Sequence, residues 1–241
     1  DLPEVSTESN LRYSTANLEK TVHIGMNVGL SKWAFHTSMS FSDFGDLTMG
    51  DTNEDAYLTP FYITQVNGQD MSMPNNNPLE QKHTAFNQLH AAQKILYKPN
   101  ERVNLDFGLH YATTSNVPRY DRLSVLDQDS NLKYAEWAYG PQSWLMANTQ
   151  LTKLSSKSQF YDKIKINTAY QNFKESRISR KFEATDRMIR SESVNAFSFN
   201  IDLDKLLSEK VNISYGAEYL FNRVGSEGIS YDVESNDIQT I

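Results

Sequence analysis

The feature that most constrains this chain is a strict alternation of apolar and polar residues that recurs along its 241 positions. From Thr21 to Leu30, every even position is apolar and every odd position is polar or glycine. Successive side chains of a β-strand point to opposite faces, so this alternation predicts a strand with one apolar and one polar face. The pattern indicates an all-β protein.

About eight strands are expected in total. The same alternation returns in the segments 33–42, 89–97, 103–112, 145–151, 164–171, 197–203 and 211–221. Only Ser31 and Lys32 separate the first two strands, which predicts a tight hairpin. No segment has a convincing helical period, so the sequence predicts antiparallel strands without an amphipathic helix.

Short and long connections alternate between these strands. Short turns are expected around Ser31, Pro99, Ser156 and Glu209, and long connections over 43–83, 115–134 and 176–190. Outer-membrane barrels have short periplasmic turns and long extracellular loops. They also carry aromatic girdles near the strand ends, a position that matches Trp33, Tyr97, Tyr111 and Phe221. A soluble sandwich fits the alternation equally well, but it does not require unequal connections.

Composition narrows the possible functions. The mean hydropathy is −0.59, and no apolar run approaches the roughly 18 residues of a transmembrane helix. This average conceals an apolar band, because a polar face compensates for it. The formal net charge of −7 opposes binding to a phosphate backbone, so no nucleic-acid partner is expected. The chain has no cysteine, which excludes disulfides, thiolate metal sites and cysteine nucleophiles.

Several segments near the strand ends resemble the barrel of TonB-dependent outer-membrane receptors. They are SDFGDLTMG (42–50), SNVPRYDRL (115–123), EWAYGPQ (136–142) and YGAEY (215–219). The resemblance implies an antiparallel transmembrane up-and-down β-barrel in the cell outer membrane, in contact with its lipid. It also implies uptake of a scarce ligand, such as a siderophore or other metal chelate, haem or cobalamin, or in some branches glycans or peptides. Energy would come from a TonB-type inner-membrane partner acting on an N-terminal plug.

The chain departs from that family pattern in several respects. No plug domain and no TonB-contact segment is recognisable in these residues, and neither Asp1–Glu4 nor Ile238–Ile241 has the pattern expected of a signal peptide or of an aromatic-ended final strand. Plugged transporters have about 22 strands, so residues 1–241 are expected to form an internal section of a larger barrel. A passive or structural outer-membrane barrel and a soluble β-sandwich carbohydrate-binding module are the alternatives.

One group of residues is the candidate ligand-binding site. Stacking faces and bidentate donors are combined in Arg119, Tyr120, Arg122, Trp137 and Tyr139. Such a set suits an aromatic or anionic small molecule at the barrel rim. The alternative is a salt-bridged anchor for the loop. No hydrolase, metalloprotease, Walker or dinucleotide motif occurs, so neither an enzyme nor a resident cofactor is expected.

Metal sites are weaker candidates. If the turn from Lys98 to Arg102 pairs Tyr97 with Val103, His90 lies directly opposite His110, where the two imidazoles could share a metal. The starts of two incomplete calcium loops are Asp51, Asn53, Asp55 and Asp127, Asp129, Asn131. The alternatives are ordinary lumen-facing polar residues and solvated loop acids.

Loop charge is uneven. Segment 43–83 carries seven acids and one lysine, whereas segment 176–190 carries five bases and two acids. The basic segment could pair with lipid phosphates, with a carboxylate-rich ligand or with the acidic loop. A solvated rim is the plainer alternative.

Overall fold

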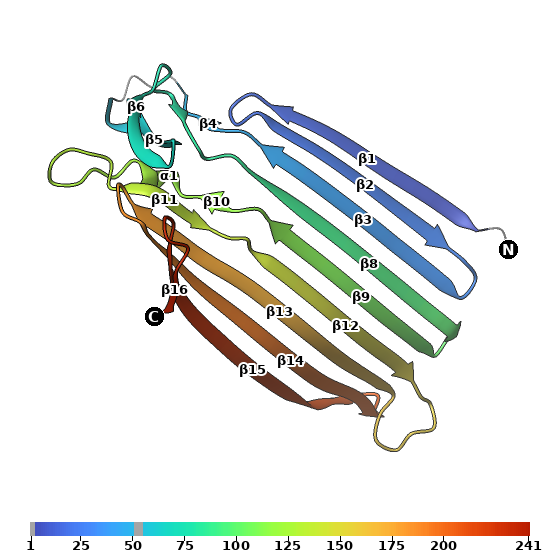
Figure 1. Ribbon diagram of the computed structural model, residues 1–241. Helices are drawn as coiled ribbons and strands as arrows, with labels where there is room; N and C mark the ends of the chain where they lie inside the picture. The colour runs from blue at the N-terminus through green and yellow to red at the C-terminus, as the bar shows by residue number, and fades with distance from the viewer. Residues whose placement is uncertain (1–2, 51–54) are drawn as a thin grey trace.

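The computed structural model describes residues 3–50 and 55–241 and contains one large antiparallel β-sheet (Figure 1). Nine strands form its wall in chain order: β1 (Glu4–Ser14), β2 (Glu19–Gly29), β3 (Trp33–Phe44), β8 (Phe86–Asn100), β9 (Val103–Thr114), β12 (Ser143–Leu154), β13 (Lys163–Lys181), β14 (Asp186–Ser208) and β15 (Val211–Asp232). The short β16 (Ile238–Thr240) pairs with the end of β15. The all-β class and the antiparallel sheet are confirmed.

The sheet has more strands than expected. Among the described residues it contains twelve, including β1, β16, β10 (Val117–Pro118) and β11 (Tyr134–Tyr139). The alternation was hard to detect in β1 because Thr7 and Ser9 interrupt the apolar face that begins with Val5. The other three strands are too short to show a period. The expected count of about eight was therefore too low.

The strand register joins the apolar faces of the separate strands into one surface, called the apolar face below. One row across the sheet consists of Val5, Val28, Phe35, Ile95, Phe107, Thr149, Thr168, Phe199 and Tyr219. The opposite surface, the polar face, carries a parallel row with Asn27, His36, Lys94, Gly108 and Asn148. The alternation in the sequence thus correctly predicted which face of the sheet these side chains lie on.

Most of the apolar face is left uncovered by the described part of the chain, and loop residues reach it only near the ends of the strands, as Asp70 does at Arg180 and Phe160 at Tyr215. Among all the described residues, the only buried hydrophobic side chains are Ile63, Leu132, Ala138 and Ile178. Large side chains of the apolar face stay substantially exposed, including Ile24, Met39, Tyr219 and Phe221, each more than half exposed. The sheet has no hydrophobic core of its own in these residues.

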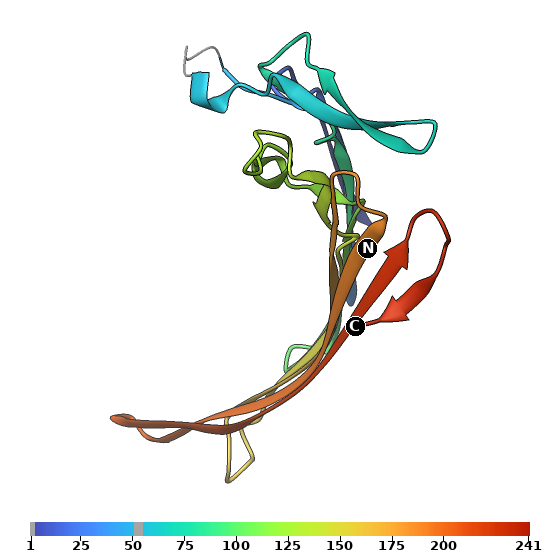
Figure 2. The ribbon, with the colours of Figure 1, turned by 60° about the vertical axis from the view of Figure 1, so that its left-hand side comes forward.

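The sheet is curved and open (Figure 2). Its two edges are β1 and the β15–β16 side, and they do not pair with each other, so the described residues form no closed barrel. Strands β13, β14 and β15 have 19, 23 and 22 residues, against about 3 to 10 in most globular proteins. None of the described helices has the length and apolar character needed to span a membrane.

The two long connections, between β3 and β8 and between β9 and β12, lie at one end of the sheet, called the loop end, together with the short turns 15–18 and 182–185. The connections at the other end, called the turn end, are all short. The predicted hairpin at Ser31 and Lys32 is confirmed, because the Leu30 N–H donates to the Trp33 carbonyl at 2.7 Å. The long segment after β3 folds into β4 (Leu47–Thr48), η1 (Asp55–Tyr57), β5 (Phe61–Val66), β6 (Gln69–Pro74) and β7 (Glu80–Gln81). The segment after β9 contains β10 and the short helix α1 (Tyr120–Leu123).

The third predicted long connection, 176–190, was wrong. There β13 and β14 continue as paired strands up to Ser179 and Met188, and only the residues between Lys181 and Asp186 form the turn. Charged residues made this segment look like a loop, but ion pairs to other loops satisfy two of those charges. The segment is a strand extension that rises beyond the rest of the sheet.

On the side away from β14, strand β13 pairs with two different strands. Its first part pairs with β12 through Lys163–Lys174, and its last part pairs with β11 through Arg177–Lys181. Residues 140–142 interrupt the line from β11 to β12, and the Ser176 hydroxyl donates to the Gly140 carbonyl there. The β10–β11 segment and α1 therefore form a separate panel at the loop end.

Candidate functional site

The candidate ligand-binding residues converge on this panel. Arg119 lies between β10 and α1, and its guanidinium stands 5.1 Å from the ring centre of Trp137 and 5.4 Å from that of Tyr139. The two rings meet edge to face, with centres 5.3 Å apart. Arg119 also donates to the Tyr139 hydroxyl at 3.0 Å. Cation and aromatic groups are thus brought together as the sequence suggested.

Asp121 already occupies the guanidinium of Arg119. Arg119 donates from Nε to Oδ1 at 2.8 Å, and its Nη2 makes a second contact with Oδ2. The hydrogen bond from Arg119 holds the pKa of Asp121 below its ordinary value, and the same contact raises the pKa of Arg119. Arg119 therefore acts first as the anchor of its own loop.

The other two candidates are more accessible. The guanidinium of Arg122 lies 5.9 Å from the ring centre of Trp137, its side chain is 48% exposed, and its contact with Asp121 is a loose 3.9 Å. Tyr120 is half exposed and lies apart from the Trp137 group, lining a hollow of about 40 Å³ with Tyr62 and His83. That hollow holds about one water molecule, so it is a seam between two loops rather than a ligand pocket.

A buried ion pair joins the acidic loop to the basic strand extension. Arg180 in β13 donates from Nη1 and Nη2 to the two carboxylate oxygens of Asp70 in β6, both at 2.6 Å. The side chains are 8% and 1% exposed. Burial alone would raise the pKa of Asp70, but the hydrogen bonds from Arg180 and from the Glu183 N–H outweigh it and lower that pKa. The third predicted alternative, pairing of the acidic loop with the basic segment, is present here.

A second bidentate pair lies beside it. Arg187 in β14 donates from Nε and Nη2 to the carboxylate of Glu136 in β11, both at 2.7 Å. This hydrogen bonding raises the pKa of Arg187. Sequence reasoning found the charge imbalance of the two segments but not these pairs, because the partners lie far apart in the chain.

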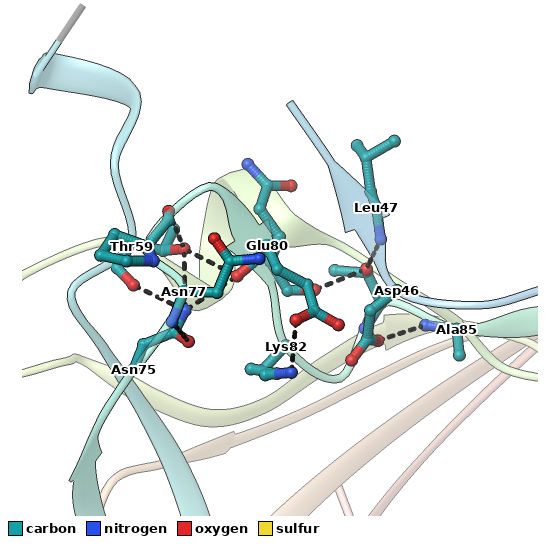
Figure 3. Close-up of polar contacts among 11 residues, drawn as sticks. Asp46, Leu47, Thr59, Asn75, Asn77, Glu80, Lys82 and Ala85 are labelled. Carbon is teal, nitrogen blue, oxygen red and sulfur yellow. Dashed lines mark hydrogen bonds and ion pairs between the residues drawn. The ribbon is translucent and has the colours of Figure 1, made fainter. Parts of the chain in front are cut away.

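Hydrogen bonds from side chains to the main chain hold the large loop in shape (Figure 3). Asn75 donates to the carbonyl oxygens of Thr59 and Glu80, both at 2.8 Å. Asp46 accepts from the N–H of Thr84 at 2.8 Å. Asn75 and Thr84 are buried, so this loop has an interior of its own.

The expected pairing of His90 with His110 was wrong. A register shift between Tyr97 and Asn100 places Tyr97 opposite Leu105, so His90 faces Ala112 and His110 faces Ala92. The two histidines still share the polar face but stand diagonally. His110 lies against Trp144 instead, with ring centres 6.3 Å apart.

The structure does not bring the candidate calcium ligands together as a metal site within the described residues. Asp51 and Asn53 lie outside the described residues, and Asp55 begins the short η1 helix. Asp127 uses one carboxylate oxygen to accept the N–H groups of Asp129 and Asn131, both at 2.9 Å, as in an Asx turn. Within 3–50 and 55–241, no three His, Asp or Glu side chains gather as metal ligands would.

The polar face carries a groove of about 610 Å³ across six strands. Its lining mixes both charges and amides, including Glu4, His36, Lys94, Asp106 and Asn148. The groove lies toward the turn end, away from the Trp137 panel. It was not predicted as a site, because its residues come from segments that are far apart in the sequence.

No known protein family matches the sequence, and no curated protein is significantly similar to it. The fold itself defines an all-β protein built on one large antiparallel sheet with structured loops at one end.

Proposed function

We propose that the chain is a section of the transmembrane β-barrel of a TonB-dependent outer-membrane receptor. In this proposal it takes up a scarce small molecule or metal chelate, such as a siderophore, haem or cobalamin, with energy from a TonB-type partner acting through a plug. Its role is binding and gating, without enzymatic chemistry. The observation that carries the proposal is the continuous apolar face that the described residues leave mostly uncovered.

Such a face is costly in water and favourable in lipid. Monomeric soluble proteins rarely expose contiguous apolar patches larger than a few hundred Å². On β15 the apolar series runs from Val211 to Phe221, about 33 Å along a strand that rises roughly 3.3 Å per residue. At the roughly 40° tilt usual for barrels, it spans about 25 Å, the height of a membrane barrel's apolar band.

The two ends of the sheet also support the proposed membrane location. Short turns at one end and folded loops at the other match the periplasmic and extracellular sides of outer-membrane barrels. Arg122 and Trp137 lie at the loop end, where a ligand would arrive from outside. Three of the four segments that resemble TonB-dependent receptors, 42–50, 115–123 and 136–142, also lie at this end, and the fourth, 215–219, lies within β15 (Figure 1).

Membrane insertion is tested first. Vesicles carrying the protein should protect the wall strands from added protease and leave the loop end open to cleavage, and the folded protein should migrate faster on a gel before heating than after. Full digestion of the wall, with no heat-dependent migration, would contradict the membrane proposal and favour a soluble sandwich.

Energy coupling is tested separately in cells producing the full reading frame. Accumulation of a labelled siderophore, haem or cobalamin should depend on this protein and should fall to background when the TonB-type partner is deleted. Accumulation that persists without that partner would indicate a passive barrel.

A further inference from the structure

We propose that Lys174 and Arg223 bind the phosphate groups of an anionic membrane lipid. Both residues lie on the apolar face at its border toward the loop end. The inference rests on the proposed membrane location and adds a specific lipid contact to it.

The register places both bases just beyond the apolar band. Along β15 the apolar face changes from Tyr219 and Phe221 to Arg223, and along β13 it changes from Tyr170 through Asn172 to Lys174. Aromatic residues followed by bases are the usual order at the level of lipid headgroups. The two charges are therefore at the depth where lipid phosphates lie.

The surface between the two bases carries small and polar side chains. Asn195 accepts hydrogen bonds from the Tyr170 hydroxyl at 2.7 Å and from Asn172 at 2.9 Å, which marks the end of the band. Ser193 and Gly225 follow in the same row as Lys174 and line one hollow of about 520 Å³ with it. Glu175, Glu192 and Glu227 also border this hollow, and Arg223 lies one row outside it. Two strand spacings, about 10 Å, separate the strands that carry the bases, so their long side chains can converge on one headgroup over Ser193.

Both bases keep their charge available. Neither takes part in an ion pair with any residue in 3–50 or 55–241, unlike Arg180 and Arg187 further along the same face. Glu175 and Glu192 lie on the polar face, where Arg177 contacts them at 3.6 and 4.0 Å. Glu227 lies beyond Gly225, further from the band. The border thus presents two free cations to the bilayer.

The test measures lipid preference of the inserted protein. Spin-labelled phosphatidylglycerol and phosphatidylcholine are compared for association with the protein in phosphatidylcholine vesicles. Lys174→Gln with Arg223→Gln should lower the preference for phosphatidylglycerol, by about fivefold for each charge removed. The control, Lys94→Gln with Lys165→Gln, removes the same charge from the polar face and should leave the preference unchanged.

Each other outcome overturns the inference. Equal association of both lipids with the inserted wild type, or equal losses in the two double variants, would remove the lipid site but leave the proposed function standing. Loss of the preference in excess inorganic phosphate would indicate a free-anion site. Failure of the wild type to enter phosphatidylcholine vesicles would overturn the membrane proposal and this inference together.

Discussion

Charged residues at the loop end serve mainly to hold loops together. Asp70 and Arg180 bury almost all of their side chains in a bidentate pair, and Asp121 binds Arg119 through two contacts that are partly exposed. Buried pairs of this kind give little net stability, but removing one partner is expensive because the other charge stays buried. Arg122 is the cation of the Trp137 group that stays available to a ligand.

The Asp70–Arg180 pair gives the first prediction. Asp70→Asn leaves Arg180 with an unpaired buried charge, so docking of the β5–β6 hairpin should weaken by about 3 kcal/mol. Hydrogen exchange of the hairpin amides measures this change. Asp129→Asn removes an exposed charge from another loop and should leave the hairpin unaffected.

Acid should act on the same contact. The pKa of Asp70 lies below its ordinary value of 3.8, so the folded state binds the proton less readily than the unfolded state. The stabilisation is complete above pH 3.8 and is lost as the pH falls through the lowered pKa. Exchange of the β5–β6 amides should accelerate in that range in the wild type. The Asp70→Asn variant should show no such step, and an identical step in both proteins would assign it to another group.

At the scale of strands, alternation predicted most of the wall because each wall strand carries apolar side chains on one face and mostly polar side chains on the other. Alternation did not predict features that depend on contacts between distant segments or on a shift in strand register. The ends of β13 and β14 continue through Arg180 and Arg187 because remote carboxylates satisfy these charges. The diagonal placement of His90 depends on a register shift near Asn100, which residue type alone does not reveal. The cluster of Arg119, Trp137 and Tyr139 was predicted, but the pairing of Arg119 with Asp121 depends on the geometry of the loop.

The two faces of β14 give a prediction at this scale. Ile201 lies in the middle of the apolar band, and its neighbour Asn200 lies on the polar face. Ile201→Lys should lower the free energy of unfolding in lipid vesicles by about 2 to 4 kcal/mol. Asn200→Lys, the matched control, should change it much less, because the new charge lies opposite Glu218. Urea titration of vesicle-bound protein measures both, and equal effects would mean that the band does not face lipid.

The described chain is an open sheet. Ion pairs join the segments at its loop end, whereas its two edge strands do not pair with each other. Strand β9 is paired on both sides, whereas β15 has no partner on its outer side between Val211 and Glu227 among the described residues. Unpaired edges of this length readily accept another strand. The wall is therefore incomplete as a hydrogen-bonded unit.

Amide exchange tests the edge directly. Along β15, amides directed away from β14 should exchange at least about a hundredfold faster than their neighbours, while all amides of β9 stay protected. Uniform protection of β15 in the same sample would show that another strand, from this chain or a second copy, pairs with that edge.

The long reach of the Asp70–Arg180 contact bears on the order of folding. Each wall strand pairs with the wall strand before or after it in the chain, and most of these pairs are joined by short turns that close with little loss of chain entropy. Asp70 and Arg180 are 110 positions apart, and they meet only after the intervening strands have aligned. We therefore expect the rim to close last, so that the ion pair reports completion of the wall rather than starting its assembly.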